Sequence, residues 1–152
     1  MIVVGDASVY IALGRIDALS LLPRLYKEVH VPDAVWCEID RPGFPPPEWI
    51  IRHSLSRPLP SADWTEPLDA GESEALHLAR QLHAALVLID EAAGRAVARR
   101  LGLEVTGTVG LLVDAKRRGL LTFIRPLLDR LRQSGFWLSS QVYQAALTAA
   151  GE

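Results

Sequence analysis

The chain has 152 residues, of which 49% are hydrophobic and 22% are charged, and its formal net charge is −2. A chain of this length and composition can bury a substantial core, and it is too apolar to be intrinsically disordered. No apolar run approaches the roughly 20 residues of a membrane-spanning helix. We therefore expect a single globular domain over residues 1–152, with no membrane as a partner.

The cysteine count and the charge distribution lead to expectations about the location of the protein and about its partners. Cys37 stands alone, which excludes an internal disulfide, and the N-terminus lacks a signal peptide, so a cytoplasmic location is expected. Cys37 itself is predicted to be a small core side chain. Residues 1–90 carry seven Lys/Arg and thirteen Asp/Glu, whereas residues 91–152 carry nine and five. A basic half could contact phosphates while an acidic half holds cations, although a solvated surface would show the same segregation.

In chain order, "VVGDASVYIAL" (3–13) predicts a short buried strand at 2–4 that leads through Asp6 into a helix at 8–14 capped by Ser8. A second helix is expected at 17–26 and a strand at 28–31. Pro32 suits the first turn of the next helix, 32–40, because its missing N–H costs nothing there. The proline-rich stretch 42–67 then reads as an irregular excursion that contains a short helix at 48–55.

The remainder alternates regularly between helices and strands. Gly102, Gly119 and Gly135 lie where C-terminal helix caps belong. The "FWL" stretch (136–138) could add an edge strand. The expected elements are helix 70–83, strand 86–89, helix 91–101, strand 104–106, and helices 108–118, 124–134 and 140–149. This alternation predicts an α/β fold with a mostly parallel sheet.

Two aspartates directly follow predicted strands. Asp6 follows the first strand, and Asp90 follows the apolar "LVLI" (86–89). In parallel α/β sheets, ligands bind outside the carboxyl ends of the strands. We therefore expect both carboxylates at one sheet edge.

Two glutamates extend this set. Glu38 shares a helix face with apolar residues that precede it by three and four positions, and it follows the second strand. In "GESEALHLARQL" (71–82), a rotation of 100° per residue places Glu72 nearer the buried stripe than Glu74. A carboxylate buried alone is costly, so each glutamate needs a partner.

Together, Asp6, Glu38, Glu72 and Asp90 form an acidic set without an obvious Lys or Arg among them. Clustered carboxylates require protons or cations, and oxygen ligands favour Mg²⁺ or Mn²⁺ over Zn²⁺. Such sites suit phosphodiester hydrolysis. Each acid also has a structural interpretation: Asp6 and Asp90 as helix caps, Glu38 as a solvent-facing side chain, and Glu72 as a partner of the helix dipole.

The order of these four acids resembles that of the PIN-domain nucleases, which include the VapC-type toxins of toxin–antitoxin pairs. The matching blocks are "GDASVYIAL", "VPDAVWCEI", "GESEALHLA" and "LVLIDEAAGRAVA", while "VTGTVGLLVDAKRRGLL" is similar to an uncharacterised PIN-like branch. The resemblance implies a three-layer α/β/α fold with a short, mostly parallel central sheet. It also implies that the four acids are the catalytic, metal-binding quartet of a Mg²⁺- or Mn²⁺-dependent ribonuclease, with Ser8 beside the first acid as a substrate-binding residue.

The resemblance further implies RNA as the substrate, and it allows an antitoxin protein or a second copy of the chain as a partner. "TGTVG" (106–110) resembles a phosphate-binding turn in which Thr108 contacts substrate, although Thr108 as a plain N-cap is the stronger interpretation. The candidate contacts to the nucleic-acid backbone are Arg95, Arg99, Lys116, Arg117 and Arg118, of which Arg117 and Arg118 are the leading pair.

Two other functions remain open. A PIN-like nucleic-acid-binding or regulatory module without turnover would carry the same motifs. A phosphatase of the haloacid-dehalogenase type also begins with an aspartate after the first strand. That chemistry requires a second aspartate two residues later, where this chain has Ser8, and we disfavour it.

Overall fold

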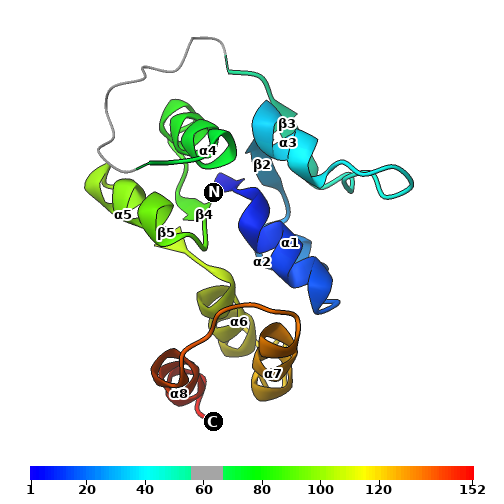
Figure 1. The fold of residues 1–152 in the computed structure, drawn as a ribbon, viewed down its shortest axis with the longest axis vertical. Helices are drawn as coiled ribbons and strands as arrows, with labels where there is room; N and C mark the ends of the chain where they lie inside the picture. Colours follow the sequence, from blue (N-terminus) through cyan, green and yellow to red (C-terminus); the bar gives the residue numbers. More distant parts are fainter. Residues whose placement is uncertain (56–66) are drawn as a thin grey trace.

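The computed structural model describes residues 1–55 and 67–152 and contains one parallel five-stranded sheet in the order β3-β2-β1-β4-β5 (Figure 1). The strands are β1 (Val3–Gly5), β2 (Val29–Pro32), β3 (Ile50–His53), β4 (Leu86–Leu88) and β5 (Val105–Thr106). The central strand β1 pairs with β2 on one side and with β4 on the other. The carboxyl ends of these three neighbours therefore meet at one edge of the sheet.

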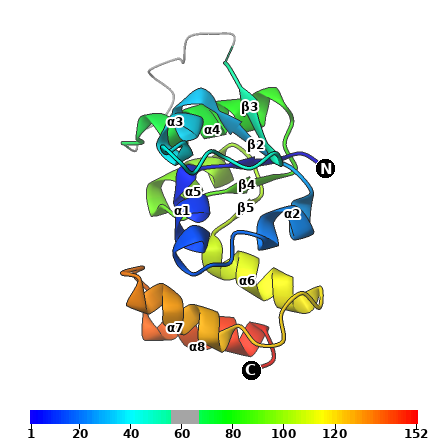
Figure 2. The same ribbon diagram turned by 90° about the vertical axis from the view of Figure 1, so that its right-hand side faces the viewer.

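Helices cover both faces of the sheet. They are α1 (Ala7–Arg15), α2 (Leu21–Tyr26), α3 (Asp33–Ile39), α4 (Ala70–Gln81), α5 (Ala92–Arg100), α6 (Thr108–Arg117), α7 (Arg125–Gln133) and α8 (Ser140–Ala149). Alternate strand residues enter two hydrophobic cores: Val3 and Leu88 pack with α1, α2 and α6, while Val4 and Val87 pack with α4 and α5. The predicted three-layer α/β/α fold is confirmed, and α7 and α8 lie outside α6 (Figure 2).

The structure corrects the prediction for the segment around Trp49. Residues 50–53 form β3, a strand paired in parallel with β2, and the predicted helix 48–55 was wrong. The pairing partner lies about twenty residues upstream, so local periodicity gives no sign of it. Residues 56–66 of the predicted excursion 42–67 lie outside the described part of the chain.

Four smaller expectations were also wrong. Residues 136–138 form no strand. α2 begins at Leu21 and not at Asp17, whose positive φ of 58° is incompatible with an α-helix. Asp6, and not Ser8, occupies the N-cap position of α1. Cys37 lies exposed on α3 and does not join the core.

The predicted glycine caps at the C-terminal ends of three helices are confirmed. Gly102, Gly119 and Gly135 each follow a helix with φ between 74° and 94°, the left-handed conformation that favours glycine.

Among the helices in the described ranges, none is long and apolar enough to cross a membrane.

Candidate acidic active site

Asp6 lies where β1 passes into α1, and its backbone N–H still donates to Leu88 of β4. Only 6% of Asp6 is exposed. The Ser8 hydroxyl donates to Asp6 Oδ2 at 2.9 Å and accepts from the Asp90 N–H at 3.2 Å. Burial raises the pKa of Asp6, and the hydrogen bond from Ser8 offsets only part of that rise. Ser8 thus joins the loops that follow two neighbouring strands.

Asp90 is held by the start of α6. Thr108 donates its backbone N–H to Asp90 Oδ1 and its hydroxyl to Oδ2, both at 2.7 Å. Thr108 is completely buried, and the N-cap position belongs to Gly107, so the interpretation of Thr108 as a plain N-cap was wrong. A Cβ at Gly107 would lie 2.6 Å from Asp90 Oδ1, which explains why this position lacks a side chain. The two hydrogen bonds fix the orientation of the Asp90 carboxylate.

Glu72 lies in the first turn of α4 and forms a capping box with Asp69. Asp69 Oδ1 accepts from the Glu72 N–H at 2.7 Å, and Glu72 Oε1 accepts from the Asp69 N–H at 3.4 Å. Glu72 is only 6% exposed, as its helical phase predicts, whereas Glu74 is half-buried. The second oxygen, Glu72 Oε2, is buried without a hydrogen-bond partner. Burial, followed by the charge of Asp69, raises the pKa of Glu72 to about 7.

Glu38 reaches the same place from α3. A Cβ at Gly71 would lie 2.5 Å from Glu38 Oε1, 3.3 Å from Asp6 Oδ1 and 3.5 Å from Asp69 Oδ1. Oxygens from three segments therefore surround one point, where glycine leaves room. Glu38 is more exposed than predicted, yet partial burial and the charges of Asp6 and Asp69 raise its pKa.

Asp69 is a site residue that the sequence reasoning missed. The signal was available, because an Asp followed three residues later by Glu before an apolar helix is the pattern of a capping box. The interpretation of Glu72 rested on its helical phase and on the helix dipole, and neither of these involves Asp69. Asp69 raises the pKa of Asp6, Glu38 and Glu72, so it belongs to the same electrostatic cluster.

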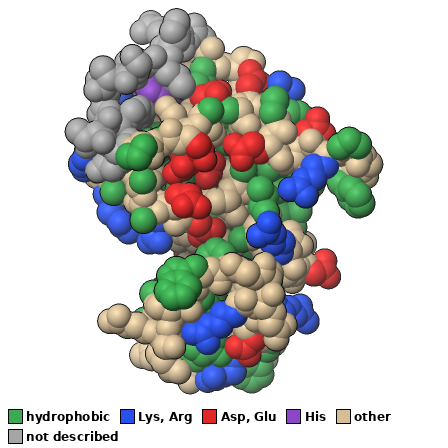
Figure 3. All heavy atoms as spheres, viewed as in Figure 1, with side chains coloured by type: hydrophobic (Ala, Val, Ile, Leu, Met, Phe, Trp, Pro, Cys, Tyr) green, Lys and Arg blue, Asp and Glu red, His purple; other side chains and the backbone are tan. Residues whose placement is uncertain are grey.

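This acidic cluster consists of Asp6, Glu38, Asp69 and Glu72, with Asp90 beside it. Figure 3 shows acidic side chains gathered on this face of the molecule. None of the ion pairs formed within residues 1–55 and 67–152 involves these five acids. Within the same ranges, no group of three or more His, Cys, Asp or Glu side chains is positioned to hold a metal ion. The donor chemistry, the space at Gly71 and the unpartnered Glu72 oxygen nevertheless fit a hard divalent cation.

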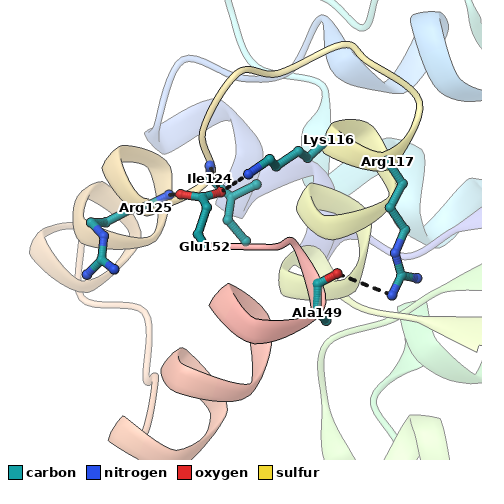
Figure 4. Close-up of polar contacts among 6 residues, drawn as sticks. All are labelled: Lys116, Arg117, Ile124, Arg125, Ala149 and Glu152. Atoms are coloured by element: carbon teal, nitrogen blue, oxygen red, sulfur yellow. Dashed lines mark hydrogen bonds and ion pairs between the residues drawn. The ribbon is translucent and has the colours of Figure 1, made fainter.

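The structure does not bring Arg117 and Arg118 to these acids. Thr108 begins α6 and Arg117 ends it, so the two residues are about 13 Å apart along the helix. Arg117 donates to the Ala149 carbonyl at 3.4 Å (Figure 4), and Arg118 donates to the Leu25 carbonyl at 3.0 Å. Their proposed contact with substrate would therefore require a strand that extends along α6.

Two hollows flank Asp90 and have Phe136 and Trp137 as shared walls. One has a volume of about 390 Å³ and includes Arg95, and the other has a volume of about 510 Å³ and includes Ser8 and Arg15. Of the predicted basic contacts, Arg95 is the one placed beside an acid of the set. The aromatic residues and Arg15 did not figure among the predicted site residues.

Comparison with known proteins identifies the family. A family model described as "PIN domain" matches residues 2–152. A solved PilT N-terminus domain protein from the hyperthermophilic archaeon Sulfolobus solfataricus P2 superposes with a TM-score of 0.53 at 18% identity, over 76% of this chain and 93% of that one. This level of identity shows a shared fold alone. A search of curated proteins found no match. The match over nearly the whole chain shows that the protein belongs to the PIN-domain family, which has a nuclease-type fold.

Proposed function

We propose that the protein is a metal-dependent endoribonuclease whose catalytic acids are Asp6, Glu38, Glu72 and Asp90. The observation that carries the proposal is the acidic cluster, whose carboxylates come from several elements and lack a cationic partner among the described residues. Three of its members have raised pKa values, because burial disfavours their charged forms and neighbouring carboxylates add repulsion. Membership in the PIN-domain family supports the same chemistry.

The oxygen donors favour Mg²⁺ or Mn²⁺, which Asp6, Glu38 and Glu72 would hold together with Asp90 and Asp69. A divalent ion bound there would supply an activated water and charge stabilisation of the leaving oxygen. The protein's own contribution is positional. Thr108 fixes the Asp90 carboxylate, Ser8 links Asp90 to Asp6, and the capping box fixes Glu72 at the start of α4.

RNA as the substrate, a cytoplasmic location and a role as the toxin of a toxin–antitoxin pair complete the proposal. The RNA substrate and the toxin role rest on the family resemblance, and the location rests on the single cysteine. A small neighbouring reading frame whose product binds the chain and blocks cleavage would support the toxin role. A second copy of the chain is a further proposed partner, which sedimentation of the purified protein would test.

One observation favours a second candidate, a binding module without turnover. Both Asp90 oxygens already accept hydrogen bonds from Thr108, and no three acids of residues 1–55 and 67–152 are positioned to hold a metal ion. RNA cleavage assayed with Mn²⁺ and with EDTA, for the parent and for Asp6→Asn, decides between the two. Cleavage that requires Mn²⁺ and is lost in Asp6→Asn supports the nuclease. RNA binding without cleavage supports the module.

A further inference from the structure

Trp137 presents its ring to solvent next to the proposed catalytic site. Its exposed fraction is 86%, the largest among the big hydrophobic residues of the described ranges. Its neighbours behave differently, since Leu138 is buried and Phe136 packs against the core. A single exposed hydrophobic side chain is common on protein surfaces, so the position of Trp137 in the walls of both hollows, and not its exposure alone, indicates a contact surface.

The backbone around Trp137 is held on both sides. The Phe136 N–H donates to the Leu131 carbonyl at 3.0 Å, and Arg132 Nε donates to the Leu138 carbonyl at 3.3 Å. The Ser139 hydroxyl caps α8 by accepting from the Val142 N–H at 3.1 Å. Because the loop is fixed in advance, binding of a ligand to the ring would cost little further conformational entropy of the loop.

The two hollows beside Trp137 contain charges of both signs, because Asp90 lines both of them and Glu91 lines the second. Each of the two hollows that Trp137 shares with Asp90 contains one arginine, Arg95 in the first and Arg15 in the second. Among the described residues, neither arginine forms an ion pair with a carboxylate, and Arg95 Nε is buried without a hydrogen-bond partner. Figure 3 shows hydrophobic side chains directly below the acidic ones on this face.

An aromatic ring between unpaired cations matches the chemistry of a nucleotide, which offers a planar base and an anionic phosphate. A nucleotide fits better than an apolar protein surface, because each hollow combines apolar side chains with an arginine that forms no ion pair in the described ranges. The hollows open onto Asp90, so a strand bound there would continue into the acidic cluster.

We propose that Trp137 is a base-stacking platform that positions single-stranded nucleic acid beside Asp90, with Arg95 and Arg15 contacting adjacent phosphates. This inference rests on the proposed function and names a subsite for its substrate. A duplex keeps its bases stacked on one another and offers no free face to an isolated indole. The platform therefore selects unpaired strands.

The test measures binding of a fluorescein-labelled 12-nucleotide oligouridylate by anisotropy, in EDTA so that no cleavage occurs. Trp137→Ala should weaken binding by about 5- to 100-fold, the range for loss of one stacked base. Trp137→Phe should stay within about threefold of the parent. Phe123→Ala is the matched control, because Phe123 is 61% exposed and lines neither hollow, and it should bind like the parent.

A second readout uses tryptophan fluorescence with the unlabelled oligonucleotide. The parent should be quenched on binding, and Trp137→Phe should bind with much less quenching, because the stacking ring is no longer the fluorophore. A 12-base-pair RNA duplex should bind the parent and Trp137→Ala equally. Equal oligouridylate affinities of the parent and Trp137→Ala, or unchanged quenching in Trp137→Phe, would overturn the platform.

The outcomes separate this inference from the proposed function. A protein that never cleaves RNA but shows the Trp137 effects loses the nuclease function and keeps the platform as part of a binding module. A protein that cleaves with Mn²⁺ while Trp137→Ala binds normally keeps the nuclease function and loses the platform. If Trp137→Ala changes only the sedimentation behaviour, the ring serves self-association and the platform is overturned.

Discussion

Two glutamates in different parts of the molecule have opposite surroundings. Glu72 leaves one oxygen buried without a hydrogen-bond partner, and burial with the charge of Asp69 raises its pKa to about 7. Glu152 accepts from Lys116 Nζ at 3.0 Å, from the Ile124 N–H at 2.7 Å and from the Arg125 N–H at 3.3 Å (Figure 4). Burial disfavours the Glu152 carboxylate, but these three donors outweigh it and lower its pKa.

The comparison shows that this fold supplies hydrogen-bond donors to a carboxylate with a structural role, since Glu152 links α6 to the residues at the start of α7. At the carboxyl edge of the sheet, by contrast, Glu72 Oε2 is buried without a hydrogen-bond donor. Unsatisfied buried charge destabilises a protein, so a cluster of this kind indicates a ligand that completes it. The following predictions test whether Glu72 is functional in the sense that Glu152 is structural.

The largest expected effect is on cleavage. Glu72→Gln keeps the shape of the side chain but removes a charged ligand, so we expect metal-dependent RNA cleavage to fall by more than about 100-fold. Glu74→Gln, two residues away and half-buried, should retain most of the activity. Single-turnover cleavage rates of the two variants provide the measurement. The reverse order would place the wrong glutamate in the site.

The second prediction concerns thermal stability with and without metal. In EDTA, Asp6→Asn should melt at the parent's temperature or higher, because it removes one charge from a repulsive cluster. Mg²⁺ at about 100 times its dissociation constant should stabilise the parent by roughly 2.7 kcal/mol and the variant much less. A purely capping Asp6 predicts the opposite: about 1 kcal/mol lost on substitution and no response to Mg²⁺ in either protein.

The third prediction is a pH dependence of stability in EDTA. The folded pKa of Glu72 lies above its ordinary value, so its favourable contribution is complete below pH 4.5 and is lost as the pH rises toward about 7. The parent should therefore lose about 1–2 kcal/mol relative to Glu72→Gln between pH 5 and pH 8. Urea unfolding of both proteins at each pH gives the difference. A constant difference would mean that the folded protein does not retain the Glu72 proton.

Glu152 is the control, because its pKa is shifted in the opposite direction to that of Glu72. Its folded pKa is lowered, so its contribution is present above the ordinary value of 4.5 and is lost as the pH falls through the folded pKa. The difference in unfolding free energy between the parent and Glu152→Gln should therefore shrink only below about pH 4.5, and it should stay constant between pH 5 and pH 8. If both variants showed the same pH window, the contrast between the two glutamates would fail.

The sequence predicted those parts of the fold that depend on local pattern. Apolar runs and glycine stops located four strands and all eight helices of the described ranges to within a few residues. β3 was missed because its stability comes from pairing with β2, a long-range contact. The exposure of Cys37 was missed because a single residue in a short helix has no reliable phase.

The candidate site shows the same difference between features set by local pattern and features set by long-range contacts. Strand ends and helical phase predicted that Asp6, Asp90 and Glu72 lie near the carboxyl edge of the sheet. They did not predict that Thr108 would use both polar groups on Asp90, or that Trp137 would lie exposed beside it. Those contacts join segments about 18 and 47 residues beyond Asp90, and only the tertiary structure brings them together.

The smallest expected effect separates two pairs of arginines. Arg15 and Arg95 line the hollows beside Asp90, whereas Arg117 and Arg118 donate to backbone carbonyls at the far end of α6. Each phosphate contact on a single strand contributes about 0.7 to the slope of log affinity against log salt. Replacing Arg15 and Arg95 by Gln should therefore reduce the slope for oligouridylate by about 1.4, whereas replacing Arg117 and Arg118 should reduce it by less than half as much. Anisotropy titrations in EDTA between 50 and 200 mM salt, with melting curves to exclude unfolding, provide the slopes. An equal reduction by both pairs would mean that the strand continues along α6, and that Arg117 and Arg118 contact substrate as the sequence predicts.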